Sequence, residues 1–175
     1  WEPFLEDESR IDTSSFKSVI EGTTKVKDIA AQCFKEKKYD AALAKYSKAL
    51  NYVETYMPDD LPKNDEQELK NLKIVLYNNI AICCIKVGKY KQALEPTTKI
   101  LHLEEIEDKQ KAKALYRRGL AYHHLNNPDM ALTDLEFATM FSASDPAIHK
   151  AIIDAKKLKK DLHDKEKKNL SKMFE

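Results

Sequence analysis

The sequence has little glycine, little cysteine and almost no net charge. Its 175 residues include 3 Gly and 3 Cys, and the formal net charge of the chain is +1. Three glycines are too few for a turn-rich β protein or for a glycine-rich phosphate-binding loop. A net charge near zero also argues against nucleic acid as a partner, because nucleic-acid-binding domains concentrate positive charge.

Long hydrophobic runs are absent as well. No apolar stretch approaches the roughly 20 residues that span a bilayer, and no signal peptide is visible, so we expect no membrane partner and a cytoplasmic location. The odd number of cysteines (Cys33, Cys83 and Cys84) favours buried free thiols in a reducing compartment. Partner ligands at metal spacing are missing, so we expect neither a metal site nor a cofactor.

The chain does contain a pattern that repeats three times. A small residue in one helix is followed twelve residues later by a second one, with a short polar turn between them. The pairs are Ala30 with Ala42, Ala81 with Ala93, and Gly119 with Ala131. Small residues let two helices approach closely, and this helix–turn–helix pattern is typical of a tetratricopeptide repeat of about 34 residues.

The repeat spacing predicts the domain organisation. The first small residues of the three pairs lie 51 and 38 residues apart, so the first interval contains an insertion. We predict an all-α fold of three repeats (about 23–56, 74–107 and 112–145), with the insertion at about 57–73. The six helices should form a right-handed superhelix, and a seventh helix over 146–175 should cover its open end.

Turn and capping residues predict the helix limits. Pro58 and Pro62 predict a loop, and Asn64 with Gln67 resembles a capping box that opens the third helix. Pro96 lies inside the expected fourth helix, over about 90–103, and predicts a kink or a late start there. Asn127 should cap the sixth helix, with Pro128 in its first position.

The two ends of the chain carry opposite charge. Residues 1–22 contain six acids, Glu2, Glu6, Asp7, Glu8, Asp12 and Glu21, against two bases, which predicts an acidic linker with one short helix near 15–20. Because the chain starts without Met, we expect a further domain upstream. Residues 150–175 contain nine Lys against five acids, so the end of the seventh helix is also a candidate basic site for calmodulin.

The first helix of each repeat should line a concave groove. By the helical period, that groove collects three cations and a carboxamide: Lys27, Asn79, Lys113 and Arg117. We predict that these residues bind the carboxylates of a peptide C-terminus. The alternative is that all four are solvated surface side chains. The other predicted groove-lining residues are Ala31, Phe34, Ile82, Cys83, Lys86, Ala121 and His124.

These residues resemble a known family. The segment from Lys27 to Lys35, the long insertion, Lys-Ala-Leu-Tyr-Arg-Arg (113–118) and the tail at 165–174 are similar to the tetratricopeptide domain of large immunophilins of the cyclophilin type. In that family the groove is a clamp for the C-terminal Met-Glu-Glu-Val-Asp of heat shock protein 90, and heat shock protein 70 is a second candidate partner. The resemblance implies that Lys27, Asn79, Lys113 and Arg117 form the clamp.

The chain departs from the family at one clamp position. Where the family has an Asn one turn after the first Lys, this chain has Ala31. A lost hydrogen bond to a charged group costs on the order of 1.5–3 kcal/mol, so we expect weaker binding or a shifted preference for the peptide terminus. By helical count, Gln32 and Asn78 point off the groove face and do not replace this donor.

An enzyme within these residues is not expected. The histidines (His102, His123, His124, His149 and His163) have no acid and nucleophile partners in a recognisable order. The resemblance implies a peptidyl-prolyl isomerase domain upstream in the parent protein. The alternative function is a generic scaffold that binds another peptide segment. We expect the chain to be a monomer.

Overall fold

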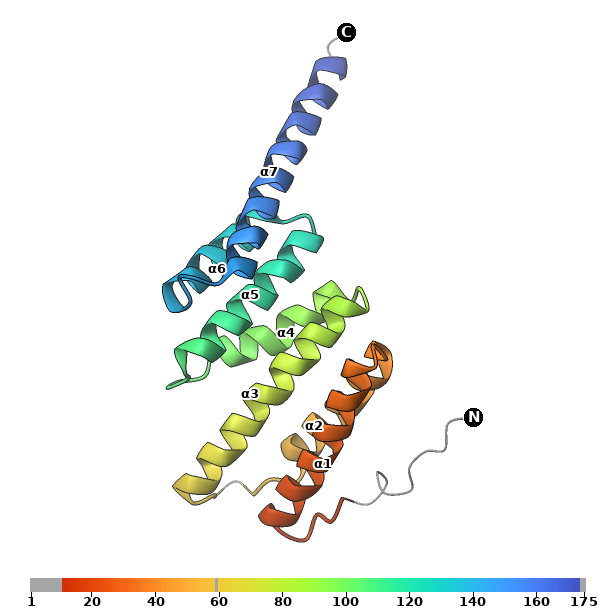
Figure 1. The fold of residues 1–175 in the computed structure, drawn as a ribbon, viewed down its shortest axis with the longest axis vertical. Helices are drawn as coiled ribbons and strands as arrows, with labels where there is room; N and C mark the ends of the chain where they lie inside the picture. Colours follow the sequence, from red (N-terminus) through yellow and green to blue (C-terminus); the bar gives the residue numbers. More distant parts are fainter. Residues whose placement is uncertain (1–10, 59, 174–175) are drawn as a thin grey trace, which may run out of the picture. The chain divides into compact units, whose positions relative to one another are not determined.

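The computed structural model describes residues 11–58 and 60–173, and within these ranges the chain is helical and contains no strand (Figure 1). It forms two compact units, Trp1–Val87 and Gly88–Glu175. The first unit contains α1 (Phe16–Lys35), α2 (Tyr39–Thr55) and α3 (Lys63–Lys86). The second contains α4 (Tyr90–Leu101), α5 (Asp108–His124), α6 (Pro128–Phe141) and α7 (Pro146–Met173). The prediction of an all-α fold is confirmed.

Helix α1 begins earlier than the sequence predicted. Ser15 is its N-cap, and the Ser15 hydroxyl accepts a hydrogen bond from the Ser18 amide at 3.1 Å. The short helix predicted near 15–20 is therefore the first part of α1. Val19 and Ile20 are buried, and their packing makes this part continuous with the first repeat helix, in place of a linker. The predicted acidic residues Glu2, Glu6, Asp7 and Glu8 lie outside the described residues.

Helix α3 also differs at its start. It begins at Lys63 after Pro62, and no side chain caps it, so the predicted capping box at Asn64 is wrong. Asp65 and Glu66 lie in the first turn, where negative charge stabilises the positive end of the helix dipole. Most of the predicted insertion is therefore an N-terminal extension of α3.

The turns within the three repeats share one backbone feature. A residue with positive φ follows α1, α3 and α5, namely Lys37 (61°), Gly88 (76°) and Asn126 (56°). Such a left-handed residue commonly ends a helix, and Gly and Asn adopt it most easily. These residues are separated by the same 51 and 38 positions as the small residues, which supports the repeat register.

Close approach of two helices is clearest in the second unit. A Cβ atom on Gly119 of α5 would lie 2.7 Å from Cγ of Leu135 in α6, so only glycine fits at this contact. Asn127 caps α6 by accepting a hydrogen bond from the Met130 amide at 3.3 Å, with Pro128 first in the helix, as predicted.

Pro96 does not delay α4. The helix starts at Tyr90, and Pro96 is buried within it, so the predicted late start is wrong. The turn before Pro96 supplies the hydrogen-bonded start, since the Ala93 amide donates to the carbonyl of Lys89 at 3.2 Å.

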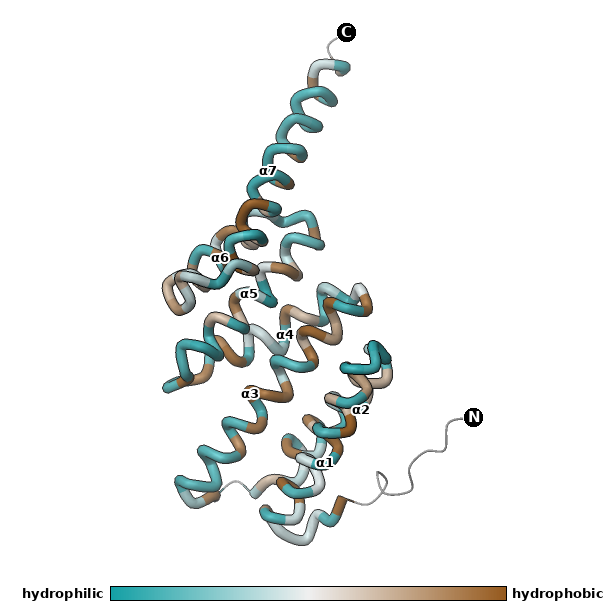
Figure 2. The backbone as a smooth tube through the Cα atoms, viewed as in Figure 1, coloured by the Kyte–Doolittle hydropathy of each residue, from teal (hydrophilic) through white to brown (hydrophobic). Residues whose placement is uncertain are grey.

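Helix α7 packs only through its first half. Ala151 and Ala155 are buried against Ala131 and Leu135 of α6, whereas every described residue after Leu162 is exposed. Figure 1 shows the end of α7 running past α5 and α6, and Figure 2 shows that this end is mostly hydrophilic. The first half therefore covers the last repeat, while the second half projects from it.

Candidate functional site

The predicted site residues divide between the two units. Lys27 and Asn79 lie on α1 and α3, which contact each other in the first unit. Lys113 and Arg117 lie on α5 in the second unit.

Lys27 already has a carboxylate beside it. Its Nζ donates to Oδ1 of Asp28 at 2.7 Å, and the Lys27 side chain is 24% exposed against 65% for Asp28. An ion pair with one partner so exposed contributes little, typically 0.2–1 kcal/mol. Asp28 therefore screens Lys27 and would compete with the carboxylate of any ligand.

The position one turn after Lys27 offers no donor. Ala31 is half-buried there, and its two candidate substitutes are placed elsewhere. The amide of Gln32 donates to Oε1 of Glu36 at 2.8 Å, and Asn78 is buried, with 2% exposure. Gln32 is exposed, but its amide is engaged by Glu36, and the burial of Asn78 keeps its side chain from solvent.

Tyr39 joins two of the predicted groove residues. Its ring packs edge-on against Phe34 of α1 at 5.1 Å between centroids, and Nζ of Lys86 in α3 lies 5.9 Å from its centroid. A cation over an aromatic face is attracted by the ring quadrupole. Tyr39 is not among the predicted groove-lining residues, although its place directly after the first turn is a usable signal. Ile82, on α3, is half-buried.

Two predicted groove-lining residues are completely buried. Cys83 and Ala121 each have 0% exposure, so neither presents a surface to solvent. This differs from the expectation that they line an open groove. Both behave instead as small core residues.

In the second unit, Lys113 and Arg117 lie one turn apart on the same face of α5. Lys113 is exposed and Arg117 is half-buried. Partial burial, followed by the positive charges of Arg117 and Lys109, lowers the pKa of Lys113. The positive charges of Arg117 and Lys109 thus repel the charged form of Lys113, and an anion bound at this face would offset that repulsion.

Arg118, next in sequence, has a different role. Its Nε and Nη2 donate to the two carboxylate oxygens of Asp134 at 2.7 and 2.8 Å, and its Nη1 donates to the Thr98 hydroxyl at 3.2 Å. The hydrogen bond to Asp134, which is 3% exposed, raises the pKa of Arg118. The bidentate pair ties α5 to α6, and the bond to Thr98 ties it to α4, so together they hold the rotation of α5 that orients Lys113 and Arg117.

His124 lies near the C-terminal end of the same helix. Its ring stacks on Tyr90 of α4 with 4.3 Å between centroids and an interplanar angle of 9°. Burial, followed by the positive charge of the neighbouring His123, lowers the pKa of His124, which favours the neutral ring. The stacked pair joins α4 to the end of the helix that carries the two cations.

The described residues hold no group of three or more His, Cys, Asp or Glu side chains that could bind a metal ion. Among the helices within 11–58 and 60–173, none combines the length and the apolar character of a membrane span.

No protein-family model matches the chain. A curated relative, peptidyl-prolyl cis-trans isomerase D of Kluyveromyces lactis, is 45% identical over 174 residues, which cover 99% of this chain and 47% of the relative. The chain thus spans about half the length of the curated relatives it matches.

Solved structures support the fold. The C-terminal tetratricopeptide domain of a Plasmodium falciparum putative FK506-binding protein matches 85% of this chain and 96% of that chain, with a TM-score of 0.74 and 21% identity. The myosin chaperone UNC-45 of C. elegans, solved in complex with an Hsp90 peptide, matches 85% of this chain and 14% of its own. Its TM-score is 0.65 and its identity is 28%.

Proposed function

This chain is a tetratricopeptide-repeat domain of the cyclophilin-type co-chaperones, and from that premise we propose that it binds the free C-terminus of a chaperone. The proposed ligand is the Met-Glu-Glu-Val-Asp terminus of heat shock protein 90, with the similar acidic terminus of heat shock protein 70 as a second target. Lys27, Asn79, Lys113 and Arg117 would supply the donors for its carboxylates.

The observation that carries the proposal is the pair of cations on α5. Lys113 and Arg117 lie one turn apart, and partial burial, followed by repulsion from Arg117 and Lys109, lowers the pKa of Lys113. A terminal Asp presents two carboxylates, one on the backbone and one on the side chain, and each can accept charge-assisted hydrogen bonds from a separate cation. The ligand would therefore remove an electrostatic cost that the free protein carries.

The first unit is expected to contribute less than in other members of the family. Lys27 forms an ion pair with Asp28, and Ala31 lacks the carboxamide side chain that the family has at this position. We therefore expect Lys113 and Arg117 to supply most of the affinity, with Asn79 as the carboxamide donor of the first unit.

Titration of the peptide as free acid and as C-terminal amide tests this function. We expect the amide to bind at least tenfold more weakly, because it lacks the charge and one acceptor of the free carboxylate. A hydrogen bond to a charged group contributes about 1.5–3 kcal/mol to the binding free energy. Lys113→Ala and Arg117→Ala should each weaken the acid by a similar amount. Lys157→Ala, on α7, is the matched control. Equal binding of acid and amide would rule out a carboxylate clamp.

We place the isomerase activity of the whole protein in a domain outside these residues, and we assign the protein to the cytoplasm.

A second candidate partner is calmodulin, because the exposed end of α7 combines many lysines with exposed Leu170 and Met173. A calcium-dependent titration of calmodulin against the domain and against Leu170→Glu separates this interaction from peptide binding.

A further inference from the structure

Helix α5 carries five cations, and they divide into two groups. Two of them are engaged within the unit: Nζ of Lys111 lies 5.5 Å from the ring centroid of Phe141, and Arg118 pairs with Asp134. Both partners belong to α6, so these cations stabilise the packing of α5 on α6. The other three are Lys109, Lys113 and Arg117.

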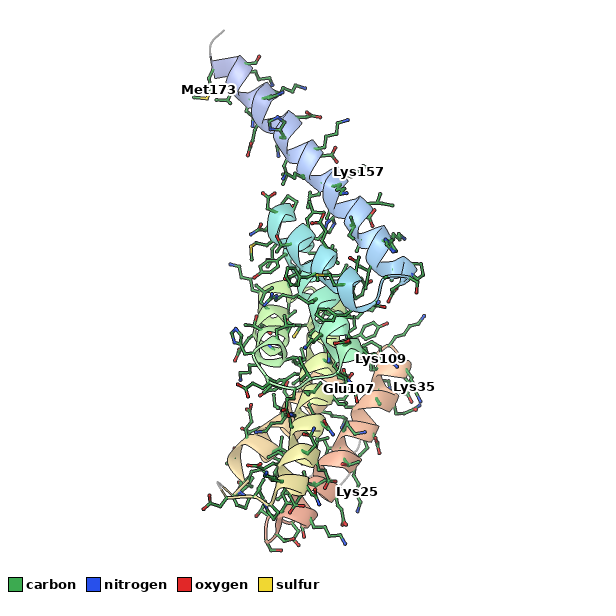
Figure 3. All side chains as sticks on the ribbon, turned by 90° about the vertical axis from the view of Figure 1, so that its left-hand side faces the viewer. Lys25, Lys35, Glu107, Lys109, Lys157 and Met173 are labelled. Atoms are coloured by element: carbon green, nitrogen blue, oxygen red, sulfur yellow. The ribbon has the colours of Figure 1, made fainter. Side chains whose placement is uncertain are left out.

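These three cations follow one another at steps of four residues. Each is a helix neighbour of the next, and the row winds around α5 by about 40° per step. Lys109 and Lys113 are exposed, and within the described residues neither forms an ion pair or a hydrogen bond. Their proximity is electrostatically significant, since the charge of Lys109 contributes to the lowered pKa of Lys113. The row thus extends one turn beyond the two residues assigned to the clamp, toward the start of the helix, where Figure 3 labels Lys109.

We propose that Lys109 is a third cation of this peptide-binding face and pairs with an acidic side chain upstream of the peptide's C-terminal residue. This inference rests on the proposed function. It adds a rule of specificity: the domain would prefer a peptide with an acidic residue two or three positions before the terminal one.

The dimensions of helix and peptide favour this assignment. Adjacent cations of the row are about 6 Å apart along the helix axis, from 1.5 Å per residue. An extended peptide rises about 3.3 Å per residue, so two residues span about the same distance. With the terminal Asp at Lys113 and Arg117, the Glu two positions before it is the first candidate for Lys109.

A double-mutant cycle tests the pairing. Wild type and Lys109→Ala are titrated with three free-acid peptides: Met-Glu-Glu-Val-Asp, Met-Glu-Gln-Val-Asp and Met-Gln-Glu-Val-Asp. At low salt, Lys109→Ala should weaken the first peptide by about two- to fivefold, the range for an exposed ion pair. The same substitution should leave at least one of the Gln peptides unaffected, which identifies the acidic side chain that Lys109 contacts.

Lys157→Ala provides the matched control, because it removes the same charge from α7 of the same unit, well away from Lys109 (Figure 3). It should not change any of the three affinities. Equal losses for all three peptides in Lys109→Ala, or no loss for any, would overturn the proposal. A failure of the proposed function is distinguishable, because then the free acid and the amide of Met-Glu-Glu-Val-Asp bind equally to the wild type.

Discussion

Substitution of Asp28 by Asn should tighten peptide binding. In the free protein, the Asp28 carboxylate accepts a hydrogen bond from Lys27 at 2.7 Å, so a ligand carboxylate must replace it. Asn keeps the size of the side chain and has a similar helix propensity. The substitution removes the charged competitor and leaves Lys27 in place.

The expected magnitude has two parts. The free protein of Asp28→Asn no longer has the exposed ion pair, so peptide binding no longer has to break it, which favours binding by about 0.2–1 kcal/mol. Removal of repulsion between Asp28 and a ligand carboxylate about 6 Å away adds about 0.3 kcal/mol at physiological salt. Together these correspond to affinity about two- to ninefold higher.

Calorimetric titration of Met-Glu-Glu-Val-Asp at about 0.05 and about 0.5 M salt measures the effect, and the gain should shrink at high salt because of screening. Asp60→Asn, in the exposed loop before α3, changes the charge equally and serves as the control. Unchanged or weaker binding in Asp28→Asn would contradict the reasoning, as would the same gain in Asp60→Asn.

Three further predictions follow from the structure. Ala31→Asn should restore a donor one turn after the first clamp cation and tighten the same peptide about tenfold or more; an unchanged Kd would mean that no donor is missing. Asp134→Ala should lower the free energy of unfolding by about 3 kcal/mol, because it leaves Arg118 without its buried partner. Glu136→Ala, exposed on the same helix, should stay within about 0.5 kcal/mol in the same urea titration. Because the pKa of His124 is lowered in the folded state, its stabilising contribution is complete above the ordinary value of about 6.5 and is lost as the pH falls through the lowered value. His124→Gln should therefore flatten the decline in stability between about pH 7 and 5, and an unaltered slope in thermal melts would refute this.

The repeat architecture was predictable because it depends on small residues at helix–helix contacts and on helix-capping residues, which can both be recognised in a sequence. Ala30, Ala81 and Gly119 are fully or nearly fully buried at the spacing the sequence showed, and Asn127 caps α6 as expected. The start of α1 was not predictable from charge. Burial of Val19 and Ile20 outweighs the acidic, linker-like composition of the residues before them.

The candidate site was predictable only in part. Residues four apart lie on nearly the same helix face, so the pairing of Lys113 with Arg117 followed from the period. Each step of four residues turns by about 40°, and over two steps Ala121 has rotated by about 80° from Lys113. That drift accounts for the burial of Ala121. The contacts of Lys27 with Asp28 and of Phe34 with Tyr39 depend on side-chain rotamers, which spacing does not determine.

The proposed function requires that this domain recognises a free carboxylate terminus. The most direct measurement is the Kd ratio for Met-Glu-Glu-Val-Asp as amide and as free acid, in wild type and in Lys113→Ala. We predict a ratio of at least about ten in wild type and a clearly smaller ratio in Lys113→Ala. A ratio near one in wild type, or an undiminished ratio in Lys113→Ala, would contradict the claim.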